Sequence, residues 1–90
     1  MNQEAIIAEL RGRGVDCTFE YPGYIAMHPR EGVAMNVSEM NGETIEIQVA
    51  DPDGALLEVI ESGIPCDCDD VMRVADFLVC AYTQALNLAR

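Results

Sequence analysis

Hydrophobic and polar residues alternate in three stretches of the first half of the chain, residues 15–20, 33–38 and 43–50. In the last stretch, Ile45 and Ile47 point to one side and polar residues point to the other. Alternation with a period of two is typical of a β-strand that has one face in the core and one face in water. The pattern therefore predicts three half-buried strands.

Turn-forming residues separate these strands. Residues 24–28 predict a further strand, which lies between the turn sequences Tyr-Pro-Gly-Tyr at 21–24 and Pro-Arg-Glu-Gly at 29–32. Asn41 and Gly42 are the strongest short signal for a hairpin, because both residues tolerate positive φ. We therefore expect consecutive strands to pair as an antiparallel meander of three or four strands.

The chain begins with a segment of helical spacing, residues 2–11. Ile6, Ile7 and Leu10 share one face of this segment, and Asn2 is placed to cap its first turn. The segment predicts an amphipathic helix with its apolar face in the core.

A second, shorter helix is predicted over residues 53–61. Asp53 is a suitable N-cap, and Leu56, Leu57 and Ile60 fall on one face of the helix. We expect these three side chains to be buried.

A long helix is predicted from about residue 68 to residue 88. Its apolar side chains cover an arc of roughly 220°, which is twice what one buried face requires. Cys80 lies in the middle of the narrow polar stripe, where we expect a neighbouring loop to shield it. The other members of the polar stripe are Asp69, Arg73, Asp76, Thr83 and Asn87.

Two kinds of contact would cover such a wide apolar arc. The first or the short helix of the same chain is one, and a second copy of the chain is the other. In the second case, the dimer face would consist of Met72, Val79, Tyr82 and Leu86.

These elements predict a single α+β domain over residues 1–90. The expected architecture has two layers, with a three- to four-stranded antiparallel meander, an N-terminal helix and two C-terminal helices packed on one face.

The charge balance says more about possible binding partners than the overall composition does. The chain has sixteen acidic residues, five arginines and no lysine, for a net charge of −11. Residues 39–76 hold eleven of the acids and a single arginine, Arg73. Binding to phosphates depends on cationic side chains, so this balance argues against direct binding to nucleic acid or to an anionic membrane. It favours a basic protein partner, and the alternative is that the charge only keeps the protein soluble.

Two further features bear on the compartment. No apolar run approaches the ~20 residues of a membrane span. The first residues have neither a basic leader nor a long apolar stretch, so we expect a cytoplasmic protein with reduced cysteines.

The sequence Cys66-Asp67-Cys68-Asp69-Asp70 is the densest cluster of candidate ligands. A helix start explains its aspartates: Asp67 would be the N-cap, and Asp69 and Asp70 would lie in the first turn and pair with Arg73. Cys66 and Cys68 remain weak candidates for a metal, because tetrahedral zinc needs four ligands. A redox role near a helix N-terminus is the alternative for the two thiols. We expect no bound metal or cofactor.

The sequence carries no strong catalytic signal. His28 is the sole histidine, and strand alternation places it on the opposite face from Cys17. The Asp-Pro-Asp-Gly sequence at 51–54 does not fit a calcium loop, because Val49 and Ile60 would occupy positions that need acidic ligands. We therefore expect a protein that is not an enzyme.

The order of helix, three strands and helix is similar to that of the double-stranded-RNA-binding domain, but the cations that such a domain uses on phosphate are missing. In size and charge, the chain is similar to small acidic inhibitors that mimic nucleic acid, some anti-CRISPR proteins among them. That likeness implies a protein that holds a basic, nucleic-acid-binding surface.

Our leading hypothesis is accordingly an acidic interaction protein. The alternatives are a homodimeric accessory module and a small metal or redox protein. The contact residues expected for the leading hypothesis are all acidic: Glu39, Glu43, Glu46, Asp51, Asp53, Glu58, Glu61, Asp69, Asp70 and Asp76.

Overall fold

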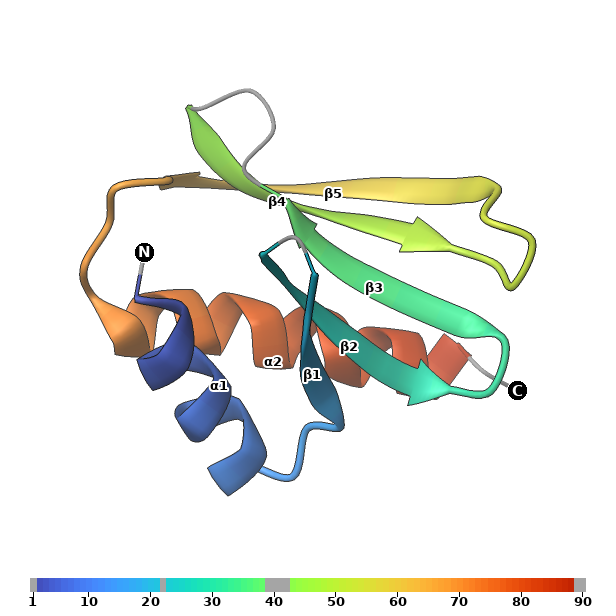
Figure 1. Cartoon of the computed structure of the whole chain (residues 1–90), viewed down its shortest axis with the longest axis horizontal. Helices are drawn as coiled ribbons and strands as arrows, with labels where there is room; N and C mark the ends of the chain where they lie inside the picture. Colours follow the sequence, from blue (N-terminus) through green and yellow to red (C-terminus); the bar gives the residue numbers. More distant parts are fainter. Residues whose placement is uncertain (1, 22, 39–42, 89–90) are drawn as a thin grey trace.

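A computed structural model describes residues 2–21, 23–38 and 43–88. It contains two helices and five strands (Figure 1). In chain order, these are α1 (Gln3–Gly12), β1 (Cys17–Glu20), β2 (Tyr24–Arg30), β3 (Val33–Ser38), β4 (Thr44–Ala50), β5 (Leu56–Pro65) and α2 (Val71–Leu88).

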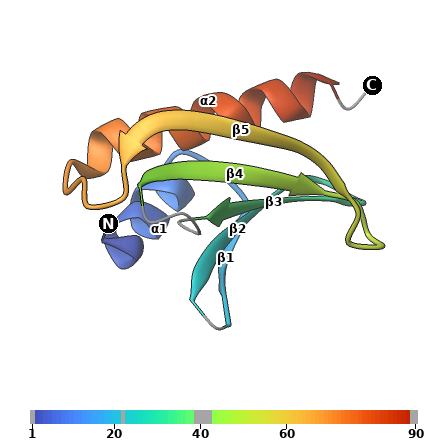
Figure 2. The same ribbon diagram turned by 90° about the horizontal axis from the view of Figure 1, so that it is seen from above.

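The strands form one antiparallel sheet in the order β1-β2-β3-β4-β5. This confirms the α+β class and the antiparallel meander, but five strands and two helices replace the expected three or four strands and three helices. The strands twist, so that β5 runs along the length of α2 while β1 lies at a steep angle to it (Figure 2).

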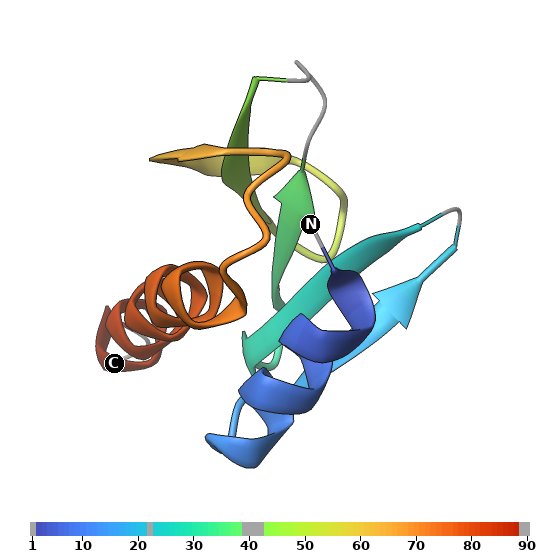
Figure 3. The same ribbon diagram turned by 90° about the vertical axis from the view of Figure 1, so that its left-hand side faces the viewer.

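The core lies between the two helices and one face of the sheet (Figure 3). Strand alternation turns Ile45 and Ile47 of β4 inward, as their spacing predicts, and both are fully buried. From the helices, Ile6, Leu10 and Leu78 meet them in a single hydrophobic cluster. None of the helices in the described part of the chain is long and apolar enough to cross a bilayer.

Helix α1 matches its prediction closely. The side chain of Asn2 accepts a hydrogen bond from the backbone N–H of Ala5, at 3.1 Å, and so caps the first turn. The predicted hairpin residues Asn41 and Gly42 lie outside the described residues. The strands on either side of them do pair, with Ser38 opposite Glu46.

The predicted short helix at 53–61 is wrong, because this segment belongs to β5. Asp53 does not cap a helix; its backbone N–H donates to the carboxylate of Asp51, at 3.0 Å. The same carboxylate accepts from the N–H of Ala55, at 2.9 Å, and Gly54 takes a positive φ of 84°. These contacts close a turn that returns the chain to the open edge of β4, where pairing satisfies its backbone.

Helix α2 begins later than predicted, at Val71. Its N-cap is Asp70, whose carboxylate accepts from the backbone N–H of Arg73 at 3.2 Å. Asp67 lies earlier, near a turn in which the N–H of Cys68 donates to the carbonyl of Pro65. The expected placement of Asp69 and Asp70 in the first turn is therefore also wrong.

Candidate protein-binding surface

The sheet brings two of the predicted acidic residues directly together. Glu46 of β4 lies opposite Glu61 of β5 in the ladder, next to the pair of buried Ile47 and half-buried Ile60 on the other face. Because Ile47 faces the helices, Glu46 and Glu61 project from the face of the sheet that carries no helix (Figure 3). Like charges directly opposite each other on a sheet are destabilising.

Further carboxylates gather at the same end of the β4–β5 hairpin. The backbone N–H of Cys66 donates to the carbonyl of Glu43 at 3.0 Å, and Thr44 pairs with Pro65. Exposed Glu43 is thereby held beside the loop that carries exposed Asp67. We name Glu43, Glu46, Glu61 and Asp67 the hairpin acidic cluster.

Sequence reasoning missed Asp67 as a member of this cluster, because it assigned that residue to helix capping. The run of aspartates in residues 66–70 is visible in the sequence. The backbone pairing of Cys66 with Glu43, which brings Asp67 beside the hairpin, is not. Glu39, another predicted contact residue, lies outside the described residues.

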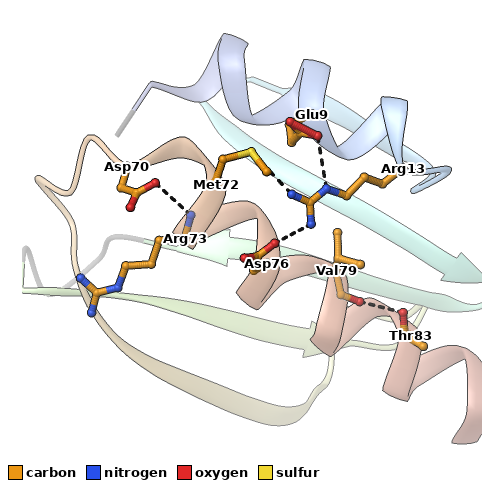
Figure 4. Close-up of polar contacts among 8 residues, drawn as sticks. All are labelled: Glu9, Arg13, Asp70, Met72, Arg73, Asp76, Val79 and Thr83. Atoms are coloured by element: carbon orange, nitrogen blue, oxygen red, sulfur yellow. Dashed lines mark hydrogen bonds and ion pairs between the residues drawn. The ribbon is translucent and has the colours of Figure 1, made fainter.

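Three other predicted contact residues have structural roles. Asp51 closes the β4–β5 turn and Asp70 caps α2. Asp76 accepts a hydrogen bond from Arg13 at 2.6 Å, and Glu9 accepts a second one at 3.2 Å (Figure 4). Asp76 and then Glu9 raise the pKa of the Arg13 guanidinium above its usual value. This ion pair ties the end of α1 to α2.

The remaining predicted acids lie apart from the cluster. Asp53 and Asp69 are exposed, on the β4–β5 turn and in the loop before α2. Glu58 lies opposite buried Val49, so it projects from the helix side of β5. Arg73 does not form the expected ion pair with Asp69 or Asp70; its guanidinium points away from Asp70 in Figure 4.

The four residues of the predicted dimer face differ in exposure. Tyr82 is buried, and its hydroxyl accepts from the backbone N–H of Asp16 at 3.4 Å. Val79 is half-buried at the margin of the core. Met72 and Leu86 are 51% and 41% exposed, and together with Val79 they follow one stripe of α2 that is about 21 Å long.

The four cysteines range from buried to exposed and form no disulfide. Cys17 is buried, and burial raises the pKa of its thiol, although the nearby Arg11 guanidinium opposes part of that rise. Cys66 and Cys68 are half-buried. Cys80 is exposed, so the expected shielding by a loop is wrong.

His28 and Cys17 lie on opposite faces of the sheet, as the alternation predicts. The Nε2 atom of His28 is 3.3 Å from the hydroxyl of Thr18, which donates to the carboxylate of Glu20 at 2.8 Å. Within residues 2–21, 23–38 and 43–88, no three His, Cys, Asp or Glu side chains are placed to hold a metal ion.

Comparison with protein-family models, with curated proteins and with solved structures finds no match to this chain.

Proposed function

We propose that this chain is a small, non-enzymatic interaction protein that holds a basic protein surface through the hairpin acidic cluster. The cross-strand pair of Glu46 and Glu61 is the observation that carries the proposal. Two carboxylates directly opposite each other repel and weaken the hairpin. A cationic partner surface would convert that local repulsion into attraction.

The distribution of cations supports this proposal. Arg13 is engaged with Asp76 and Glu9, and Arg11 donates to the carbonyl of Cys17 at 3.2 Å. The summed field of clustered carboxylates attracts cations of another molecule and raises its association rate. A cluster of this kind also stands in for the phosphates of a nucleic acid, so a nucleic-acid-binding protein is the partner class we favour.

The homodimer and the metal or redox alternatives have weaker support. In the predicted dimer face, Tyr82 is buried and Val79 is half-buried, which leaves Met72 and Leu86 as its exposed apolar members. Cys66 and Cys68 would supply two thiolates where a structural zinc needs four ligands.

The test compares two charge-matched double variants in binding to a lysine octapeptide. Glu46→Gln with Glu61→Gln should weaken binding several-fold at low salt, because it removes two charges from the contact. The control, Glu4→Gln with Glu31→Gln, removes the same charge elsewhere and should bind like the wild type. Glu31 lies in the β2–β3 turn, about 20 Å along the sheet from Glu46 and beyond the Debye length of about 8 Å at physiological salt.

Calorimetry would measure the affinity, and urea unfolding would show that both variants fold. Relief of the Glu46–Glu61 repulsion should leave the free energy of unfolding unchanged or raise it by up to about 0.5 kcal/mol. Equal weakening by the two double variants would mean that only net charge matters, and would contradict a localised binding surface.

A further inference from the structure

Strand β5 is a long edge strand. It lies at the end of the sheet order and has a neighbour on one side only, β4, with which it pairs in continuous register over Glu58–Glu61. No further strand of the described chain lies along its outer edge in Figure 3, and α2 runs beside β5 on the helix face of the sheet (Figure 2). An edge strand presents a row of backbone donors and acceptors that another strand can pair with.

The opposite edge of the sheet, formed by β1, is protected, so β5 is the more accessible of the two edge strands. Strand β1 has four residues, and α1 packs against it. The guanidinium of Arg11 donates to the carbonyl of Cys17, at 3.2 Å, and occupies one of its backbone acceptors. Short length and a covering side chain are two devices that block strand addition, and β5 shows neither.

Apolar side chains flank the free edge on both faces of the sheet. Leu56, Leu57 and Val59 are 59%, 57% and 42% exposed. Leu57 and Ile60 also line a groove of about 230 Å³ that β5 forms with the C-terminal half of α2. A strand laid along β5 would therefore find apolar contacts for its alternate side chains as well as backbone partners.

Charge decides which strand fits this edge. Glu58 projects from β5 on the helix side and Glu61 on the open side. If β5 paired antiparallel with β5 of a second copy, registers centred on this segment would bring these carboxylates opposite or diagonal to each other, on chains that each carry −11. A strand with lysine or arginine between apolar residues would meet attraction at the same positions.

We infer that the free edge of β5 takes an extended, basic segment of a partner protein as an added strand, with apolar residues of that segment in the groove beside α2. This inference rests on the proposed function, because it takes the partner to be basic. It adds the mode of binding: backbone pairing along β5, next to the acidic cluster.

Two synthetic heptapeptides test the inference. One alternates lysine with valine, and the other has proline in place of the central valine and the same charge. Proline has no backbone N–H and disrupts an extended pairing, so the second peptide should bind about tenfold more weakly. Binding of the first peptide should also slow the hydrogen exchange of backbone amides in β5.

A pair of variants with similar exposure locates the contact. Leu57→Ser on β5 should weaken binding of the alternating peptide several-fold, whereas Met72→Ser, at 51% exposure on α2, should leave it unchanged. Circular dichroism would show that both variants fold.

The possible outcomes separate the inference from the proposed function. If both peptides bind equally well, strand addition is wrong and charge attraction alone remains. If neither peptide binds, the attraction to basic chains fails as well. A dimer of the free protein that Leu57→Ser splits would overturn the inference, because the edge would then be occupied by a second copy.

Discussion

At the scale of single residues, burial divides the cysteines into reactive and unreactive thiols. The thiolate is the reacting form, so the rate of modification depends on exposure and on the thiol pKa. Cys17 is buried and its pKa is raised, which keeps the thiol protonated at neutral pH. Cys80, on α2, is exposed to solvent.

We expect iodoacetamide at pH 8 to alkylate Cys80 first, Cys66 and Cys68 next, and Cys17 last. The rates of Cys80 and Cys17 should differ by about tenfold or more. Peptide mapping by mass spectrometry after timed quenching would measure all four sites. In concentrated urea, the difference should disappear; a native Cys17 that reacts as fast as Cys80 would contradict its burial.

Residue-level features that depend on local alternation were predictable. The opposite orientation of Cys17 and His28 follows from their odd separation along a hairpin, and the structure confirms it. The N-cap of α2 was not predictable in the same way. Several aspartates in 66–70 have the right chemistry, and Asp70 is selected because the turn at Pro65 and the Cys66–Glu43 pairing hold the preceding residues outside the helix.

At the scale of elements, the β4–β5 turn decides the fold of the second half of the chain. The carboxylate of Asp51 accepts two backbone hydrogen bonds in this turn, from Asp53 and Ala55. Without these contacts, the turn would expose unpaired donors and would hold β5 less firmly against β4.

Asp51→Ala should therefore lower the free energy of unfolding by about 1 kcal/mol. Asp53→Ala serves as the control, because Asp53 contributes its backbone N–H to the turn, and it should stay within about 0.5 kcal/mol of the wild type. Urea unfolding followed by circular dichroism would measure both. A larger loss for Asp53→Ala would indicate that its side chain has the capping role that the turn geometry assigns to Asp51.

Strand β5 shows why the short helix was mispredicted. The first four residues of β5 are exposed on both faces and need no alternation, so Leu56, Leu57 and Ile60 fit helical spacing equally well. What selects the strand is the open edge of β4, which lies outside the segment. Tertiary pairing of this kind overrides a local pattern.

At the scale of the whole molecule, the acidity was predictable and its arrangement was not. Glu46 and Glu61 are fifteen positions apart, and they become neighbours only once residue 61 is known to lie on a strand paired with β4. In the same way, the wide apolar arc of α2 was visible in the sequence, but the packing of α1 and the inward turn of Tyr82 were not.

The same arrangement bears on self-association. Two copies of a chain with a net charge of −11 repel each other, and Tyr82 and Val79 of the predicted dimer face are packed in the core or at its margin. We therefore expect the wild-type protein to sediment as a monomer at physiological salt over the whole accessible concentration range.

Two glutamate substitutions on α2 distinguish a monomer from a dimer. Val79 is packed at the margin of the core, so Val79→Glu should cost about 1–3 kcal/mol of stability by placing a carboxylate in a half-buried apolar site. Leu86→Glu, at a 41% exposed position, should change neither stability nor sedimentation.

Circular dichroism with urea and analytical ultracentrifugation would be run on both variants. A wild-type dimer that Leu86→Glu converts into folded monomers would contradict the monomer and restore the helix face as an interface, because a two-fold contact places each substitution in the interface twice.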